Sequence, residues 1–228
     1  MVVALNFTAD GHRPKHDLRT MQLDYPALQA VDLGLPSYQK YSNGPGLLNK
    51  YNMNEFWMLY AFGNLNFVEM FNANDHLREE VRTRFKDRVN AAFLPKELQL
   101  KDSSQSIPSH SRLKDSDVTK RIHDVITDPQ FSPLVATDEQ LAGLPPSRVL
   151  ITEFDVLRDD SFILVERLKR VGVEVEYSYL EGEQHGFINM DIDTDVHTKE
   201  LTAFVVFYNR TVLVHQDQPR NNTLKPVD

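Results

Sequence analysis

An acidic and a basic side chain each follow a run of residues that predicts a β-strand. Asp155 comes directly after the apolar run 149–154, and His185 follows the alternating run 173–179. In open parallel sheets, functional side chains gather at the carboxyl ends of neighbouring strands. A carboxylate that binds one ring nitrogen of a histidine fixes the tautomer and leaves the other nitrogen free to take a proton from a nucleophile. The pair therefore predicts acyl-transfer chemistry, although the pattern also allows Asp155 to be a loop or capping residue and His185 a polar turn residue.

The residues around Asp155 predict a strand followed by a helix. Residues 147–154 form the strand, and their continuous apolar centre suits a sheet that is covered on both faces. Apolar residues then recur at helical spacing, and Asp159 or Asp160 can cap this helix. Gly172 can end the helix in a left-handed conformation.

Further elements complete an α/β pattern. Residues 173–180 predict the next strand, residues 200–208 lie in a final amphipathic helix, and residues 21–25 predict a short strand that Pro26 stops. A strand–helix–strand unit of this length implies parallel pairing with a right-handed crossover.

The middle of the chain is more irregular. Residues 47–71 carry aromatic and aliphatic side chains at helical spacing, which predicts two helices separated near Gly63. Residues 76–94 are compatible with a helix but highly charged. Residues 99–120 predict a solvent-exposed loop, and residues 216–228 predict a disordered tail.

The composition describes a folded protein and excludes several kinds of partner. The 228 residues are 41% hydrophobic and 25% charged, as in a globular domain. The net charge of -8 argues against nucleic acid as a partner. No apolar run reaches the roughly 18 residues of a membrane span, and no signal peptide is evident, so we expect the chain as written to be cytoplasmic. Without cysteine, disulfides and thiolate-metal sites are excluded.

Two patterns that suggest metal ligands are incomplete. His12 and His16 have the spacing of a helical metal pair, but Pro14 between them breaks a helix. Residues 191–195 begin like a calcium loop, but Val196 and Thr202 stand where such a loop needs glycine and glutamate. We therefore predict no metal site and no cofactor.

The stretches that hold the acid and the base read Phe-Asp-Val-Leu-Arg-Asp-Asp at 154–160 and His-Gly-Phe at 185–187. Shorter stretches read Tyr-Pro-Ala-Leu-Gln at 25–29, Leu-Pro-Ser-Tyr at 35–38, Ser-Pro-Leu at 132–134 and Leu-Pro-Pro at 144–146. In this order they closely resemble the hormone-sensitive-lipase-like α/β-hydrolases, and most of all their arylacetamide deacetylase and neutral cholesterol ester hydrolase branch. The resemblance spans about residues 1–210.

This resemblance implies a fold, an activity and site residues. Residues 1–215 would be the C-terminal portion of an α/β-hydrolase domain, with a mostly parallel sheet flanked by helices and a helical cap-like insertion at about 36–128. Asp155 would be the orienting acid and His185 the general base of a serine esterase that acts on apolar acyl or aryl esters without a cofactor. The aromatic stretch 51–71 would either line an acyl pocket or form ordinary core. A full-length parent could be anchored in the endoplasmic reticulum membrane.

The chain departs from the family at the nucleophile. Neither the Gly-Asp-Ser-Ala-Gly-Gly elbow nor the His-Gly-Gly-Gly stretch that binds the oxyanion occurs in the 228 residues. Ser37 follows a proline and no strand, so we exclude it as the nucleophile. Residues 1–8 resemble the helix after the elbow, so we expect the N-terminal half of the domain to be absent.

Without that half, the strand at 21–25 would have an unpaired edge, and the isolated chain would be marginally folded and inactive. Two alternatives to an ordinary esterase follow. One is an inactive truncated isoform or gene fragment that acts, if at all, by binding a partner or a lipid. The other is an enzyme completed by a second chain that carries the N-terminal half.

Overall fold

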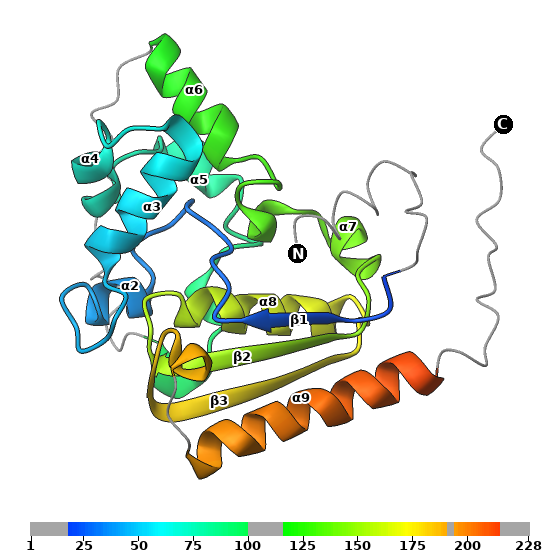
Figure 1. Ribbon diagram of the computed structural model, residues 1–228. Helices are drawn as coiled ribbons and strands as arrows, with labels where there is room; N and C mark the ends of the chain where they lie inside the picture. Colours follow the sequence, from blue (N-terminus) through cyan, green and yellow to red (C-terminus); the bar gives the residue numbers. More distant parts are fainter. Residues whose placement is uncertain (1–17, 100–115, 191–193, 215–228) are drawn as a thin grey trace, which may run out of the picture.

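The structure, a computed structural model, describes residues 18–99, 116–190 and 194–214. These residues form a three-stranded sheet with helices on its faces and a further group of helices at one end (Figure 1). The strands are β1 Met21–Asp24, β2 Ser147–Phe154 and β3 Val175–Gln184, and the two helices beside them are α8 Arg158–Arg170 and α9 Asp195–Val214. The other helices are α2 Pro36–Lys40, α3 Lys50–Phe62, α4 Val68–Asn72, α5 Glu79–Thr83, α6 Asp117–Ile126 and α7 Asp138–Ala142. Single 3-10 turns are η1 Ala91–Phe93, η2 Lys96–Leu98, η4 Pro133–Val135 and η5 Phe187–Asn189.

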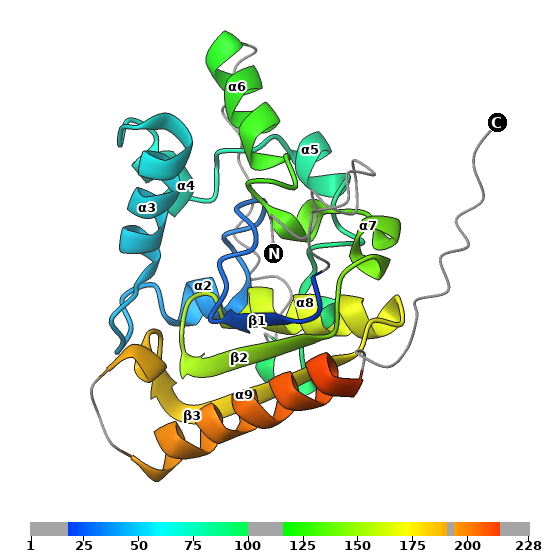
Figure 2. The same ribbon diagram turned by 45° about the vertical axis from the view of Figure 1, so that its right-hand side comes forward.

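The sheet has the strand order β1–β2–β3, and both strand pairs are parallel. Met21 lies beside Ser147, which in turn lies beside Val175. The central strand β2 is buried along most of its length, because α8 covers one face of the sheet and α9 the other (Figure 2). Within the described residues β1 pairs with β2 alone. The predicted parallel strand–helix–strand unit is therefore confirmed, and the first strand lies at an edge.

The strand β3 starts and ends later than the predicted run 173–180. Val173 is outside the strand because its N–H donates to the carbonyl of Leu168 in α8, at 3.0 Å. Gly172 makes this turn with a φ of 80°, so the predicted left-handed glycine after the helix is confirmed. At its other end the strand continues to Gln184 across a bulge.

The helix α8 begins before the residues predicted to cap it. Its first residue is Arg158, and Leu157 at the N-cap makes no side-chain capping bond. Asp159 and Asp160 are fully buried in the first turn instead. The prediction that one of them caps the helix is wrong because their carboxyl groups bind a distant segment that leads into α2 and includes its first turn. One such bond is donated by the backbone N–H of Ser37 to Asp159, at 2.7 Å.

The helices α3 and α4 are the two helices predicted within residues 47–71. Gly63, which follows α3, has a φ of 68° and accounts for the break. Residues 76–94 do not form one long helix; they contain only the short helix α5 and the turn η1. Here the buried Arg82 donates to the carbonyls of Val31 and Asn74, at 3.1 and 2.8 Å, which holds this segment against the loop before α2.

The predicted exposed loop 99–120 is wrong from Ser116 onward. Ser116 accepts a hydrogen bond from the Thr119 backbone and starts α6, whose Ile122 and Ile126 are fully buried. The helix forms because these apolar residues, which follow the polar stretch, lie on one face of the helix and pack against the core. The predictions for residues 1–8, for the His12 and His16 pair, for residues 100–115 and for the tail 216–228 lie outside the described residues.

The helix α9 contains the predicted helical segment 200–208 and is tied to the sheet by a buried ion pair. Arg148 of β2 lies 2.6 Å from Glu200, and both side chains are almost fully buried. None of the helices in the described part of the chain is both long enough and apolar enough to cross a membrane.

Candidate active site

The register of the sheet places Asp155 and His185 next to each other. Asp155 is the first residue after β2, and His185 is the first residue after β3. The last residues of these strands, Phe154 and Gln184, are paired across the ladder. The next residue on each strand therefore leaves the same edge of the sheet at the same level.

This alignment depends on the bulge in β3. Leu180 pairs with Thr152, so residues 181–184 of β3 span the length of residues 153–154 of β2. Gly182 takes up the extra length with a φ of 80°, and its N–H donates to Oε2 of Glu153 at 3.0 Å. Without the bulge, a residue earlier than His185 would have faced Asp155.

The two side chains form a hydrogen-bonded dyad. Nδ1 of His185 lies 2.9 Å from Oδ2 of Asp155, and the backbone N–H of Leu157 donates to Oδ1 of the same carboxylate at 2.8 Å. The side chain of Asp155 is 1% exposed, whereas that of His185 is 27% exposed. Because an ionised carboxylate can only accept, the proton lies on Nδ1 and Nε2 is left as the basic nitrogen. This arrangement can orient an imidazole and stabilise its protonated form.

The His185 loop is also held by a residue that the sequence reasoning did not assign to the site. The ring of Tyr25, just after β1, lies against the imidazole with centroids 5.1 Å apart. Its hydroxyl accepts a hydrogen bond from the Ile188 backbone at 2.6 Å. Burial raises the pKa of Tyr25 to about 12, so the phenol stays neutral. An aromatic residue at the end of a predicted strand, directly before Pro26, was the available signal, because strand ends collect site residues.

Ser37, which the sequence excludes as the nucleophile, is a fully buried residue in the first turn of α2. Its hydroxyl donates to the carbonyl of Val156 at 2.6 Å. A serine in this position anchors α2 to the chain between β2 and α8.

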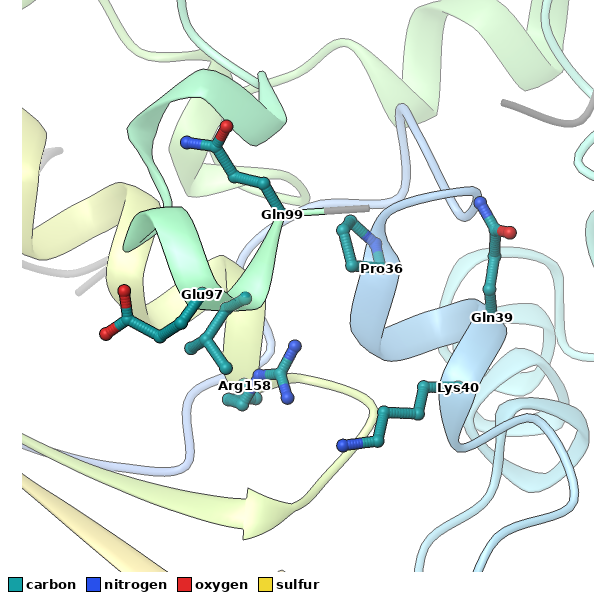
Figure 3. A pocket seen from close by; sticks show the side chains of 7 residues that line it. Pro36, Gln39, Lys40, Glu97, Gln99 and Arg158 are labelled. Atoms are coloured by element: carbon teal, nitrogen blue, oxygen red, sulfur yellow. The ribbon is translucent and has the colours of Figure 1, made fainter. Parts of the chain in front are cut away.

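A cavity of about 450 Å³ lies between α2, η2 and the start of α8 (Figure 3). Lys40 extends toward Arg158 along its wall. The charge of Arg158 is balanced by Asp159, 2.8 Å away. The lining contains neither Asp155 nor His185, so this cavity is distinct from the space in front of the imidazole.

The aromatic stretch 51–71 divides between core and surface. Trp57 and Phe71 are buried, whereas Phe56 and Tyr60 are 57% and 75% exposed. Its lining of an acyl pocket therefore stays a prediction. In the described part of the chain, no group of three or more His, Asp or Glu side chains could hold a metal ion.

The sequence matches known proteins over much of its length. A family model described as an alpha/beta hydrolase fold matches residues 106–189. Arylacetamide deacetylase from Bos taurus is 34% identical over 172 residues, which is 75% of this chain and 42% of the relative. Neutral cholesterol ester hydrolase 1 from Bos taurus is 34% identical over 175 residues, 75% of this chain and 41% of the relative. The chain thus spans about two fifths of the length of these relatives.

Solved esterase structures share the arrangement of elements. A structure from a study of two fungal esterases of Rhizomucor miehei superimposes with a TM-score of 0.57 at 19% identity, covering 94% of this chain and 48% of that one. A thermophilic carboxylesterase cloned from a metagenomic library gives a TM-score of 0.52 at 18% identity, covering 96% of this chain and 51% of that one. At these identities the similarity concerns the fold.

Proposed function

Because the chain belongs to the α/β-hydrolase family, as its motifs predict, we propose that Asp155 and His185 are the acid and the general base of a serine carboxylic-ester hydrolase. The observation that carries the proposal is the 2.9 Å contact between Nδ1 of His185 and the buried carboxylate of Asp155, at the ends of adjacent parallel strands. The names of the two relatives, one for arylacetamide deacetylation and one for neutral cholesterol ester hydrolysis, support an apolar acyl or aryl ester as the substrate class.

The dyad would act on a serine hydroxyl in two steps. In the first, Nε2 of His185 takes the hydroxyl proton while the serine oxygen bonds to the ester carbonyl carbon, and Asp155 stabilises the imidazolium. The imidazolium then gives this proton to the departing alcohol oxygen, which leaves an acyl-serine. In the second step water gives a proton to Nε2 and attacks the acyl carbon. The imidazolium returns the proton to the serine oxygen, and the carboxylic acid is released.

The serine would come from outside these 228 residues, which contain no Gly-Asp-Ser-Ala-Gly-Gly elbow. Either a longer form of the chain or a second chain would carry it. The edge of the sheet supports both routes, since β1 pairs on one side only within the described residues and an added strand can extend the sheet there.

A fused chain tests the proposal. A segment with a Gly-Asp-Ser-Ala-Gly-Gly elbow and a His-Gly-Gly-Gly stretch, taken from an esterase of this family, is joined ahead of Met1. Hydrolysis of a short-chain chromogenic ester is then measured. We expect activity in the fused chain and its loss on His185→Ala, while the 228 residues alone give no more hydrolysis than their own His185→Ala variant.

Adding the same segment as a separate chain to the 228-residue chain tests whether a second chain can complete the active site. Restored hydrolysis on mixing would favour a two-chain enzyme. A folded fusion that loses activity when the elbow serine is replaced, yet keeps it with His185→Ala, would overturn the proposed role of the dyad. An inactive fusion and an inactive mixture would favour the alternative of a non-catalytic form.

A further inference from the structure

Tyr25 occupies a strained position at the end of β1. Its φ is 45°, a conformation that residues other than glycine rarely adopt, and the following Pro26 further favours an extended backbone. Strain of this kind persists only where the surrounding contacts determine the conformation, and it concentrates at functional sites. The contacts of Tyr25 therefore indicate what the strain serves.

One of those contacts lies on β2, and the others lie on the loop that carries His185. The Tyr25 N–H donates to the carbonyl of Leu150 at 3.0 Å and so extends the β1–β2 ladder by one residue. Beyond this point the ring packs against the imidazole, tilted by 51°. The hydroxyl accepts the N–H of Ile188 at 2.6 Å, while the carbonyl of Ile188 lies 3.0 Å from Nε2 of His197. Ile188, three residues after the base, is thus held through both its N–H and its carbonyl.

We infer that Tyr25 is a positioning residue: it fixes the His185 loop, so that the imidazole keeps one orientation and Nε2 stays available to the nucleophile. This inference rests on the proposed function, because it concerns the same dyad. Asp155 holds the imidazole through Nδ1. Tyr25, at the end of β1, contacts the imidazole ring and binds the loop at Ile188. Gly186, which follows His185, has a φ of 80°. Because glycine is conformationally permissive, it does little to fix the position of His185 by itself. The neutral phenol adds no second negative charge beside Asp155.

The test uses the 228-residue chain and NMR. Tyr25→Phe removes only the hydroxyl, so we expect the Ile188 amide to exchange with solvent about tenfold faster while the tautomer of His185 is kept. Tyr25→Asn removes the ring but tolerates the left-handed backbone, and we expect it to mix the two tautomers of His185 as well. Tyr177→Phe removes a phenol hydroxyl on β3 at a half-exposed position and should leave both signals unchanged.

Three results bear on the inference. It is overturned if Tyr25→Phe and Tyr177→Phe give the same Ile188 exchange rate, or if Tyr25→Asn leaves the His185 tautomer as in the wild type while the chain stays folded. In an active fused enzyme, we expect Tyr25→Phe to lower kcat several-fold with KM nearly unchanged. A fused enzyme that does not need His185 would refute the proposed function, whereas the NMR signals of the isolated chain would still decide the role of Tyr25.

Discussion

Two neighbouring regions use buried carboxylates in opposite ways. In the dyad, Asp155 binds the side chain of His185, which is partly exposed and can change its charge. In the junction, defined here as Asp159 and Asp160 with residues 28–38, the carboxylates bind groups that are buried with them. Ser37 donates its backbone N–H to Asp159, and Leu28 donates its own to Asp160 at 3.2 Å. The first and the last of these acids are only five positions apart in the sequence.

The difference shows that one short motif contains both an acid for proton transfer, Asp155, and acids that hold the fold together, Asp159 and Asp160. A carboxylate whose partner can accept another proton at its far nitrogen can take part in proton transfer. A carboxyl group whose partners, backbone N–H groups among them, are all buried with it fixes the chain, here residues 28–38 and the helices beyond them. The dyad and the junction should therefore respond differently to substitution: the first in activity and the second in stability.

The largest expected effect is on activity in the dyad. In the active fused enzyme, Asp155→Asn should lower kcat by about 10⁴-fold, because an amide that donates to Nδ1 selects the wrong imidazole tautomer. The free energy of unfolding of the 228 residues should fall by only about 1 kcal/mol, since the amide oxygen can still accept the Leu157 N–H. Steady-state kinetics and urea unfolding measure the two quantities. A large loss of stability with unchanged kcat would reverse the assignment of the two regions.

The junction should show the complementary result. Asp159→Ala leaves the buried Arg158 without its carboxylate and the Ser37 N–H without an acceptor, so we expect a loss of about 3–5 kcal/mol in the free energy of unfolding. Asp159→Asn keeps an acceptor oxygen but not the charge, and should lie between that variant and the wild type. If urea unfolding shows less than about 1 kcal/mol for the alanine variant, the junction does not hold the fold.

A pH dependence separates the second carboxylate of the junction from the dyad. Burial raises the pKa of Asp160 from 3.8 to about 8, although Gln29 and Leu28 donate hydrogen bonds to it. Between about pH 4 and pH 8 the folded state therefore keeps a proton that the unfolded state releases. The contribution of Asp160 to stability should fall as the pH rises through this range, by at most about 1.4 kcal/mol per unit.

Asp160→Asn serves as the reference for that measurement because it cannot ionise. Urea unfolding of both chains at pH 5, 6, 7 and 8 gives the difference in unfolding free energy. This difference should shift in favour of the variant as the pH rises. A difference that stays constant over the series would mean that Asp160 is ionised in the folded state throughout.

Local sequence patterns predicted the elements that need few distant partners. The run 147–154 is β2 to the residue, because an apolar stretch after two prolines has little alternative to a buried strand. Asp155 and His185 could be placed at strand ends for the same reason. That they meet could be expected from parallel pairing, but the bulge at residues 181–183, which sets their level, consists of polar residues that suggested no strand.

The residues that were missed or misassigned act over long separations in the chain. Asp159 and Asp160 fit a local capping rule, yet their partners lie 122 and 132 residues away. Tyr25 reaches Ile188 across 163 residues. Such contacts depend on how the elements pack against one another, which helical or strand periodicity does not describe.

The smallest expected effect concerns two glycines that share the same φ but lie in different turns. Gly172 after α8 and Gly182 in the β3 bulge both have a φ of 80°, and a Cβ at either would have no neighbour within 4 Å. Alanine should therefore cost about 1 kcal/mol of unfolding free energy at each, from backbone conformation alone. Only Gly182→Ala should also change the NMR signals of the His185 ring, because only this glycine sets the length of chain between Leu180 and the dyad. Equal changes at His185 from both variants would mean that general loosening, and not the bulge, controls the position of the base.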